Sequence, residues 1–266
     1  MEYTGEKNGE YFYYSRTQSK IGIQMNKHHH SLFEVYYMKS GSCSYLVDNS
    51  IFEVVSGDII LIPEGVIHKT NYGTAPHTRL LINCTRGYIP DDVQAVMDKI
   101  IYHYRNEKTV KDVDNIFHKI EEEIERQDEF SQGIIQNLVQ ELFYLIARNQ
   151  DKTKTTSDSR SFIEDCLKYV KENYSQSLTL TDVAKKHAVS PEHLSRTFKK
   201  ETGFGFNEFV NLVRLQKAEI MLKNENGKSV SEIAYACGFN DSNYFSVIYK
   251  RTYGMTPSEA KKKIDK

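Results

Sequence analysis

The stretch "IAYACGFNDSNYFSVIYKRTYGMTP", residues 233–257, decides the fold of the C-terminal part of this chain, because a second copy of its pattern lies upstream. Residues 178–203 align with residues 228–254 at an offset of 50 that becomes 51 after the turn. The aligned pairs are Val183-Ala184 with Ile233-Ala234, Ala188-Val189 with Gly238-Phe239, Phe198-Lys199 with Tyr249-Lys250, and Gly203 with Gly254. The repeat predicts two copies of one unit, the second with an extra residue in its turn.

Each copy has the features of a helix-turn-helix. A small residue, Ala184 or Ala234, stands where the second helix crosses the first at close range. The turn needs a permissive backbone, which Gly238 supplies and Ala188 tolerates. The predicted N-caps of the second helices are Ser190 and either Asn240 or Asp241.

Residues 206–223 lie between the copies and predict one helix, which at 1.5 Å per residue spans ~27 Å. Such a helix could hold two recognition helices in successive major-groove segments, ~34 Å apart on one face of DNA. Residues 160–266 carry a net charge of +5 and the rest of the chain −6. This asymmetry suits a C-terminal module that meets a phosphate backbone, although a charged helix face is often only solvated.

The second copy resembles the signature of the AraC/XylS family of transcription regulators. The matching positions are Ile233-Ala234, Gly238-Phe239, Tyr244-Phe245, Tyr249-Lys250, Gly254 and Pro257. The resemblance covers about the last hundred residues. It implies a DNA-binding domain at 161–266, with helix-turn-helix units at about 179–201 and 229–252. The alternative is a plain helical bundle in which the repeat has no role in DNA binding.

The resemblance also implies which side chains meet DNA. They are Glu192, Ser195, Arg196 and Lys199 in the first recognition helix, and Ser242, Asn243, Ser246, Val247 and Lys250 in the second. Arg196 suits guanine and Asn243 suits adenine, because each can pair bidentately with that base. Val247 departs from the family, where arginine is common, and could touch only a thymine methyl. The lysines, with Lys200 and Arg251, are expected to meet phosphates.

The first third of the chain predicts an antiparallel β-barrel or sandwich. Residues 10–85 contain short β-branched and aromatic runs bounded by Gly, Asn, Asp and Pro. Within them, residues 22–41, "GIQMNKHHHSLFEVYYMKSG", and residues 57–71, "GDIILIPEGVIHKTN", resemble the two cupin motifs, with Asn71 one position early. This resemblance implies a cupin-like barrel at 1–90. AraC-type regulators commonly carry an effector domain of this kind.

Four polar residues of these motifs are candidate ligands: His28, His30, Glu34 and His68. The first three are spaced evenly enough to share one face of an unbroken strand. Three imidazoles and a carboxylate suit Zn, Fe, Mn or Ni, so a divalent metal is one interpretation. A metal-free effector pocket is the other. Tyr36, Tyr45 and Tyr72 could stack on a sugar ring, but tyrosine is also a common barrel residue, and they are not counted as site residues.

Residues 91–149 change to a helical period, with apolar stripes that indicate either packing against the barrel or a dimer interface. Residues 150–160, "QDKTKTTSDSR", contain no large apolar side chain and predict a flexible linker. The chain of 266 residues is therefore expected to have a two-domain α+β organisation: a cupin-like barrel with flanking helices, then an all-α domain of two helix-turn-helix units.

These patterns predict a cytoplasmic, effector-controlled transcription regulator, more often an activator in this family, and not an enzyme. No apolar run reaches the ~20 residues that span a membrane. The four cysteines form no CxxC pair and are expected to be reduced thiols. The expected partners are promoter DNA, a small molecule such as a sugar, RNA polymerase and a second copy of the chain. The alternative is a metal-dependent cupin enzyme, a dioxygenase or isomerase, fused to a DNA-binding module.

Overall fold

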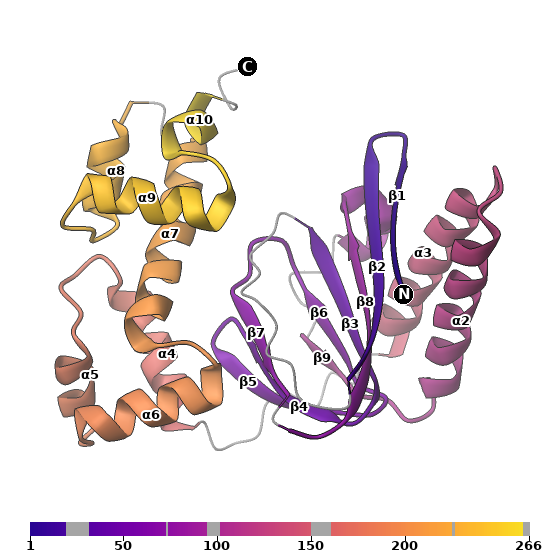
Figure 1. Ribbon diagram of the computed structural model, residues 1–266, viewed down its shortest axis with the longest axis horizontal. Coiled ribbons are helices and arrows are strands. Elements are labelled where there is room, and N and C mark those ends of the chain that lie inside the picture. The colour runs from indigo at the N-terminus through magenta and orange to yellow at the C-terminus, as the bar shows by residue number, and fades with distance from the viewer. Residues whose placement is uncertain (20–31, 73, 95–101, 150–160, 225–226, 263–266) are drawn as a thin grey trace. The chain divides into compact units, whose positions relative to one another are not determined.

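A computed structural model describes residues 1–19, 32–72, 74–94, 102–149, 161–224 and 227–262 (Figure 1). The described residues form two compact units, one drawn mainly from the chain before residue 158 and the other mainly from the chain after it. This matches the expected fold class: an antiparallel sheet domain followed by a helical domain.

Two sheets build the N-terminal unit. The larger has the order β1-β2-β8-β3-β6-β9, with antiparallel neighbours, and the smaller has the order β5-β4-β7. The strands are β1 (Glu2–Lys7), β2 (Glu10–Ser19), β3 (Phe33–Ser40), β4 (Ser42–Val47), β5 (Ser50–Val55), β6 (Ile59–Ile62), β7 (His68–Asn71), β8 (His77–Cys84) and β9 (His103–Tyr104). Because the larger sheet faces the smaller one on one side and helices on the other, both faces of its central strands β8, β3 and β6 are buried.

Alternate side chains of the larger sheet enter two different apolar clusters, as the period of a strand requires. On β3, Val35 and Tyr37 pack in the cluster that contains the long helices, whereas Tyr36 and Met38 pack in the cluster that contains Tyr45 of β4. The second cluster lies between the two sheets, because its members come from both of them. We call this space, with the side chains that point into it, the barrel interior.

The long helices α2 (Val110–Arg126) and α3 (Ser131–Asn149) cover the outer face of the larger sheet (Figure 1). Both lie within residues 91–149, where the helical period predicted helices. Their apolar stripes are buried against this sheet within the same chain. Their stripe residues are Val113, Ile116, Phe117, Ile120, Ile124, Ile135, Leu138, Val139, Leu142, Phe143 and Ile146. Packing against the sheet thus accounts for the apolar stripes of both helices. The large apolar side chains left exposed here are Phe130, Ile134 and Tyr144.

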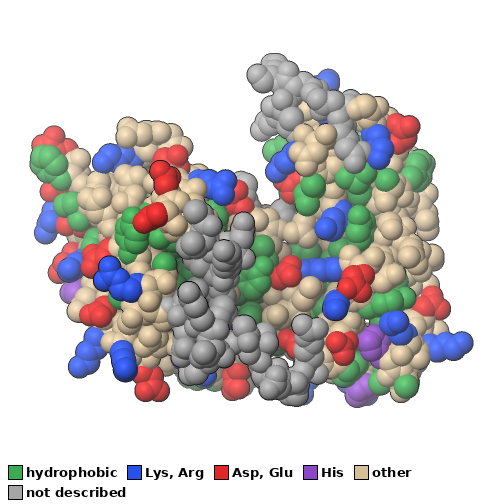
Figure 2. Space-filling model, turned by 180° about the vertical axis from the view of Figure 1, so that it is seen from behind, with side chains coloured by type: hydrophobic (Ala, Val, Ile, Leu, Met, Phe, Trp, Pro, Cys, Tyr) green, Lys and Arg blue, Asp and Glu red, His purple; other side chains and the backbone are tan. Residues whose placement is uncertain are grey.

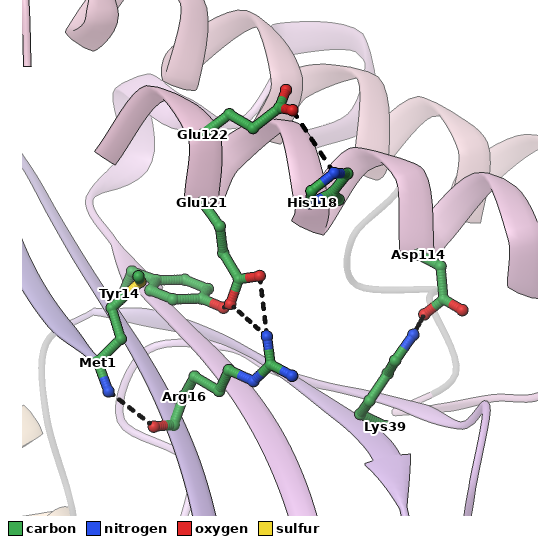
Figure 3. A network of polar contacts seen from close by, with 8 residues as sticks. All are labelled: Met1, Tyr14, Arg16, Lys39, Asp114, His118, Glu121 and Glu122. Carbon is green, nitrogen blue, oxygen red and sulfur yellow. Dashed lines mark hydrogen bonds and ion pairs between the residues drawn. The ribbon is translucent and has the colours of Figure 1, made fainter. Parts of the chain in front are cut away.

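Polar contacts fix α2 on the sheet (Figure 3). The hydroxyl of Tyr14 on β2 donates to Glu121 at 2.6 Å, and the guanidinium of Arg16 pairs with the same carboxylate at 3.1 Å. Lys39 on β3 pairs with Asp114 at 2.6 Å, two turns earlier on the helix. Because burial raises the pKa of Tyr14, its phenol remains a hydrogen-bond donor. These contacts set which turn of α2 meets which strand.

Two short strands lie outside the region predicted to be β. β1 precedes it, and β9 lies in the stretch predicted to be helical, where it pairs with β6. β1 is largely exposed, so it carries no apolar alternation to reveal it. β9 has 2 residues, too few to show a period. Helix α1 (Asp91–Gln94) and the 3-10 helix η1 (Arg86–Tyr88) complete the described elements of this unit.

The C-terminal unit consists of helices. They are α4 (Phe162–Asn173), α5 (Leu180–Lys186), α6 (Pro191–Thr202), α7 (Phe206–Asn224), α8 (Val230–Ala236), α9 (Ser242–Tyr253) and α10 (Pro257–Lys262). The pairs α5–α6 and α8–α9 are the two predicted helix-turn-helix units, and α7 runs between them (Figure 1). α5 and α8 each have 7 residues, and α6 and α9 each have 12. The predicted repeat is therefore present in three dimensions.

The two turns have the same backbone. Ala188 and Gly238 both adopt left-handed conformations, with φ of 54° and 86°. In each turn the N–H of the following residue bonds at 3.0 Å to the carbonyl of the small residue of the first helix, as in a Schellman cap. These bonds join Val189 to Ala184 and Phe239 to Ala234. The extra residue of the second copy lies after this shared turn.

Candidate functional site

Helix α6 is held by its apolar side and presents a polar side to solvent. The hydroxyl of Ser190 caps its start by accepting from the N–H of His193 at 3.2 Å, and Pro191 occupies its first turn. Leu194 and Phe198 are fully buried. The side chains predicted to meet DNA are all exposed: Glu192, Ser195, Arg196, Lys199 and the neighbouring Lys200. Burial of the apolar stripe therefore leaves all of these predicted contacts accessible.

Helix α9 is built the same way, with Asp241 rather than Asn240 as its cap. The carboxylate of Asp241 accepts from the backbone N–H groups of Asn243 at 2.7 Å and Tyr244 at 3.3 Å. Phe245 and Tyr249 form the buried side. The residues predicted to meet DNA differ in exposure: Asn243, Val247, Lys250 and Arg251 are exposed, and Ser242 and Ser246 are half-buried.

Three further details distinguish α9 from α6. The hydroxyl of Ser246 donates to the carbonyl of Ser242 at 2.9 Å, so its proton is already used within the helix. Val247, at the position equivalent to Arg196, is 66% exposed. The amide of Asn211 on α7 donates to the hydroxyl of Tyr244 at 3.1 Å. Tyr244 is 49% exposed, and the sequence showed it only as part of the repeat, not as a candidate surface contact.

Basic and acidic side chains are interspersed on the face of the molecule shown in Figure 2, and no patch of one sign gathers there. The modest net charge of the C-terminal region agrees with this. Nucleic-acid binding by this unit would therefore depend on particular exposed residues of α6 and α9 rather than on a broad basic field on that face.

The barrel interior contains a buried polar cluster. The carboxylate of Glu34 accepts a hydrogen bond from the hydroxyl of Tyr45 at 2.7 Å, and its second oxygen lies 3.7 Å from Nε2 of His68. Glu34 and His68 are 6% and 5% exposed. They come from β3 and β7, so the two predicted cupin motifs do meet in space. Tyr45, which was not counted as a site residue, completes the cluster.

The charge state of this cluster follows from its geometry. Burial alone would lower the pKa of His68, but the carboxylate of Glu34 outweighs it and raises the pKa. Nδ1 of the ring lies 2.8 Å from the carbonyl of Val66, to which it donates. Burial and the nearby carboxylate raise the pKa of Tyr45, which stays a neutral donor. The carboxylate of Glu34 thus favours the protonated form of His68.

Two of the four candidate ligands are not placed. His28 and His30 lie outside the described residues, whereas Glu34 and His68 are brought together. Among the residues that the structure describes, no group of three or more His, Cys, Asp and Glu could hold a metal ion. Binding of a metal by Glu34 and His68 would require Nε2 of His68 to be unprotonated and at least one oxygen of Glu34 to leave its present partner.

A second polar group in the barrel interior was not predicted from the sequence. Arg79 on β8 is 4% exposed and donates to the hydroxyl of Ser15 on β2 at 3.4 Å. Asn83, on the same face of β8, is 8% exposed. Residues 77–84, "HTRLLINC", carry a signal that could have revealed them, because Arg79 and Asn83 directly flank the apolar run 80–82 of one strand.

None of the described helices combines the length and the apolar character that crossing a membrane requires.

Two family models match the chain. One, described as an AraC-like ligand binding domain, matches residues 14–143, and the other, described as a helix-turn-helix domain, matches residues 183–263. The first spans the two sheets, except for β1 and the start of β2, together with α2 and most of α3. The second begins within α5 and spans the rest of both helix-turn-helix pairs. Each match therefore includes one of the two groups of candidate residues.

Similarity to individual proteins extends over both units. The chain is 24% identical over 243 residues to the transcriptional activator RhaR of Mannheimia succiniciproducens, covering 87% of this chain and 85% of that protein. It is 41% identical over 106 residues to the transcriptional regulator YijO of Escherichia coli, covering 40% of this chain and 37% of that protein. A solved structure, the C-terminal domain of AraT from Geobacillus stearothermophilus, is 30% identical with a TM-score of 0.38, covering 40% of this chain and 88% of that one.

Proposed function

The chain belongs to the AraC family of transcription regulators, and we propose that it activates promoters read by α6 and α9 under the control of a small molecule bound in the barrel interior. The observation that carries this proposal is the pair of matched recognition helices. Both have 12 residues, a polar N-cap and an apolar side buried in their own unit. Activation is proposed because RhaR, a relative whose match covers 87% of this chain, is named an activator.

The test is selection of DNA by the purified full-length chain from a random-sequence library. We expect enrichment of a site with two elements about one helical turn, ~34 Å, apart, because α7 separates the recognition helices. A double variant, Arg196→Ala with Asn243→Ala, serves as the control and should enrich no such site. Recovery of DNA without a shared sequence by the unmodified chain would contradict the proposal.

Lys250→Ala is expected to weaken binding to the selected site and to random DNA by similar factors. The ammonium of this exposed residue is proposed to meet a phosphate, which positions the protein without reading sequence. The slope of log K against log salt concentration should fall by about 1. Titrations of both DNAs at several salt concentrations measure this. The control is Lys119→Ala, an equal charge change at an exposed position of α2. A loss of affinity by Lys250→Ala for the selected site alone would contradict a phosphate contact.

Purified, tag-free protein is expected to hold far less than one metal ion per chain. Glu34 already accepts from Tyr45 and pairs with His68, and a protonated imidazole cannot ligate a metal. Elemental analysis measures this, with the His28→Ala/His68→Ala variant as the control. One metal ion per chain, lost in the variant, would contradict a metal-free pocket and would favour the metal-dependent enzyme.

The remaining partners follow from this function. A second copy of the chain is proposed to associate through the helical segment 91–149. Because the apolar stripes of α2 and α3 are buried within the chain, the dimer would use the exposed Phe130, Ile134 and Tyr144. RNA polymerase, met at the promoter, and a cytoplasmic location complete the proposal.

A further inference from the structure

Arg79 is a buried guanidinium in the barrel interior. It shares the face of β8 that carries Leu81, whereas Leu80 and Ile82 pack toward the helices on the other face. The side chain is 4% exposed, and one of its nitrogens donates to Ser15 at 3.4 Å. Its Nε has no hydrogen-bond partner among the described residues. This charge is therefore buried with little to compensate it.

Other buried charges of the same unit have partners of opposite sign. Asp58, 1% exposed, accepts from two nitrogens of Arg105 at 2.7 and 2.6 Å. Glu34 lies against His68. Among the described residues, no carboxylate is recorded in contact with Arg79, whose recorded hydrogen bond goes to the hydroxyl of Ser15. An uncompensated buried charge is costly to folding, so its presence calls for a ligand that completes it.

Two aromatic side chains near Arg79, those of Tyr72 and His77, are neutral. The ring of His77 stacks on that of Tyr72 with centroids 3.8 Å apart. Burial, together with the positive charge of Arg79, lowers the pKa of His77, which keeps this imidazole neutral. Burial raises the pKa of Tyr72 although Arg79 opposes the shift, so Tyr72 also stays neutral. The guanidinium of Arg79 thus lies near the neutral aromatic rings of Tyr72 and His77.

The other end of the same strand presents acceptors. Asn83 lies four residues beyond Arg79, ~13 Å along β8, and pairs in register with Glu34 of β3. The side-chain oxygen of Asn83 is buried with no hydrogen-bond partner among the described residues. The barrel interior therefore has a cationic end at Arg79 and an acceptor-rich end at Asn83 and Glu34.

We propose that the effector is a small hydroxylated carboxylic acid whose carboxylate pairs with Arg79 and whose hydroxyl groups donate to Asn83 and Glu34. A guanidinium and a carboxylate make a bidentate, charge-assisted pair that a neutral sugar cannot replace. The inference rests on the proposed function, since it names the class of molecule bound in the barrel interior. On this proposal, Arg79 determines the specificity for an acid over a neutral polyol of the same shape.

Thermal unfolding of the full-length chain tests this with matched pairs of ligands: galacturonate and galactose, glucuronate and glucose, gluconate and glucitol. We expect at least one acid to raise the melting temperature while its neutral counterpart does not. Titration calorimetry with that acid should show affinity at least 10-fold weaker for Arg79→Gln, because 1.4 kcal/mol is a factor of 10 and charged hydrogen bonds contribute about that much or more.

The stability of the ligand-free variants separates binding from a structural role. Arg79→Gln and Arg79→Met should melt at the same temperature as the unmodified chain or higher, by up to about 4 °C, because a buried uncompensated charge is removed. Arg16→Gln is the control, an exposed arginine on the helix side of the same sheet, and should keep the response to the acid. A large fall in melting temperature of both Arg79 variants would indicate a structural role and overturn the proposal.

The proposal would also be overturned if an acid and its neutral counterpart raised the melting temperature equally. The same holds if only neutral compounds raised it, or if no acid did. These failures are distinct from failure of the proposed function. If the chain still selects a DNA site, only the chemistry assigned to the barrel interior is wrong.

Discussion

Replacing Gly238 with alanine is expected to lower the free energy of unfolding by about 2–4 kcal/mol. Gly238 has φ of 86°, a conformation that costs an L-residue about 1–2 kcal/mol. A Cβ there would also lie 2.6 Å from the carbonyl oxygen of Tyr174. That oxygen is held in place, since Arg214 on α7 donates to it at 2.8 Å. The clash would therefore fall on backbone that has little freedom to move.

The repeat provides a matched substitution that is expected to change the free energy of unfolding in the opposite direction. Ala188 occupies the equivalent turn position with φ of 54° and is exposed. Ala188→Gly should raise the free energy of unfolding by about 0.5–1 kcal/mol, because relief of the left-handed strain exceeds the added entropy of the unfolded chain. Urea denaturation followed by circular dichroism at 222 nm measures both, as the chain contains no Trp. Equal and small effects of the two substitutions would contradict the close approach at Gly238.

Arg196→Ala is expected to weaken binding to the selected DNA site by about 1–3 kcal/mol and to relax preference at one base pair. The guanidinium is exposed on the polar side of α6, opposite the buried Leu194 and Phe198, so it is free to meet a base edge. Arginine pairs bidentately with O6 and N7 of guanine. Titrations with the selected site, with a library of its single-base variants and with random DNA measure the change.

The equivalent position on α9 supplies the control. Val247→Ala removes an apolar side chain that offers no hydrogen bond, so its effect on affinity should be several-fold smaller than that of Arg196→Ala. An equal loss on the selected site and on random DNA for Arg196→Ala would contradict base reading and leave Arg196 as a phosphate contact. A larger loss for Val247→Ala would mean that the second recognition helix dominates specificity.

The C-terminal unit could be predicted from the sequence to a large extent because its information is local. The offset of the repeat located both turns, the extra residue of the second turn and the buried side of each recognition helix. The choice between Asn240 and Asp241 as cap was left open, since both side chains can cap a helix and only the backbone geometry selects Asp241.

The barrel interior was predicted less well because it is formed by residues far apart in the chain. The cupin spacing identified Glu34 and His68, and the structure brings them together, but Tyr45 was set aside and Arg79 and Asn83 were missed. A strand pattern tells which residues share a face, not which faces meet. The apolar stripes of residues 91–149 were also ambiguous between packing on the barrel and packing on a second chain. A stripe that packs on its own sheet has the same period as one that packs on a partner.

The sequence by itself determined the two helix-turn-helix units, their polar and buried sides and the β-rich character of the first third, because these depend on contacts between near neighbours in the chain. Only the tertiary structure decided that the apolar stripes of α2 and α3 lie on the chain's own sheet and that Glu34, Tyr45 and His68 form one cluster. It also decided that Arg79 is buried with no carboxylate in contact among the described residues. The physical reason is that the energy of a buried charge depends on every group around it, and those groups come from strands separated by most of the domain.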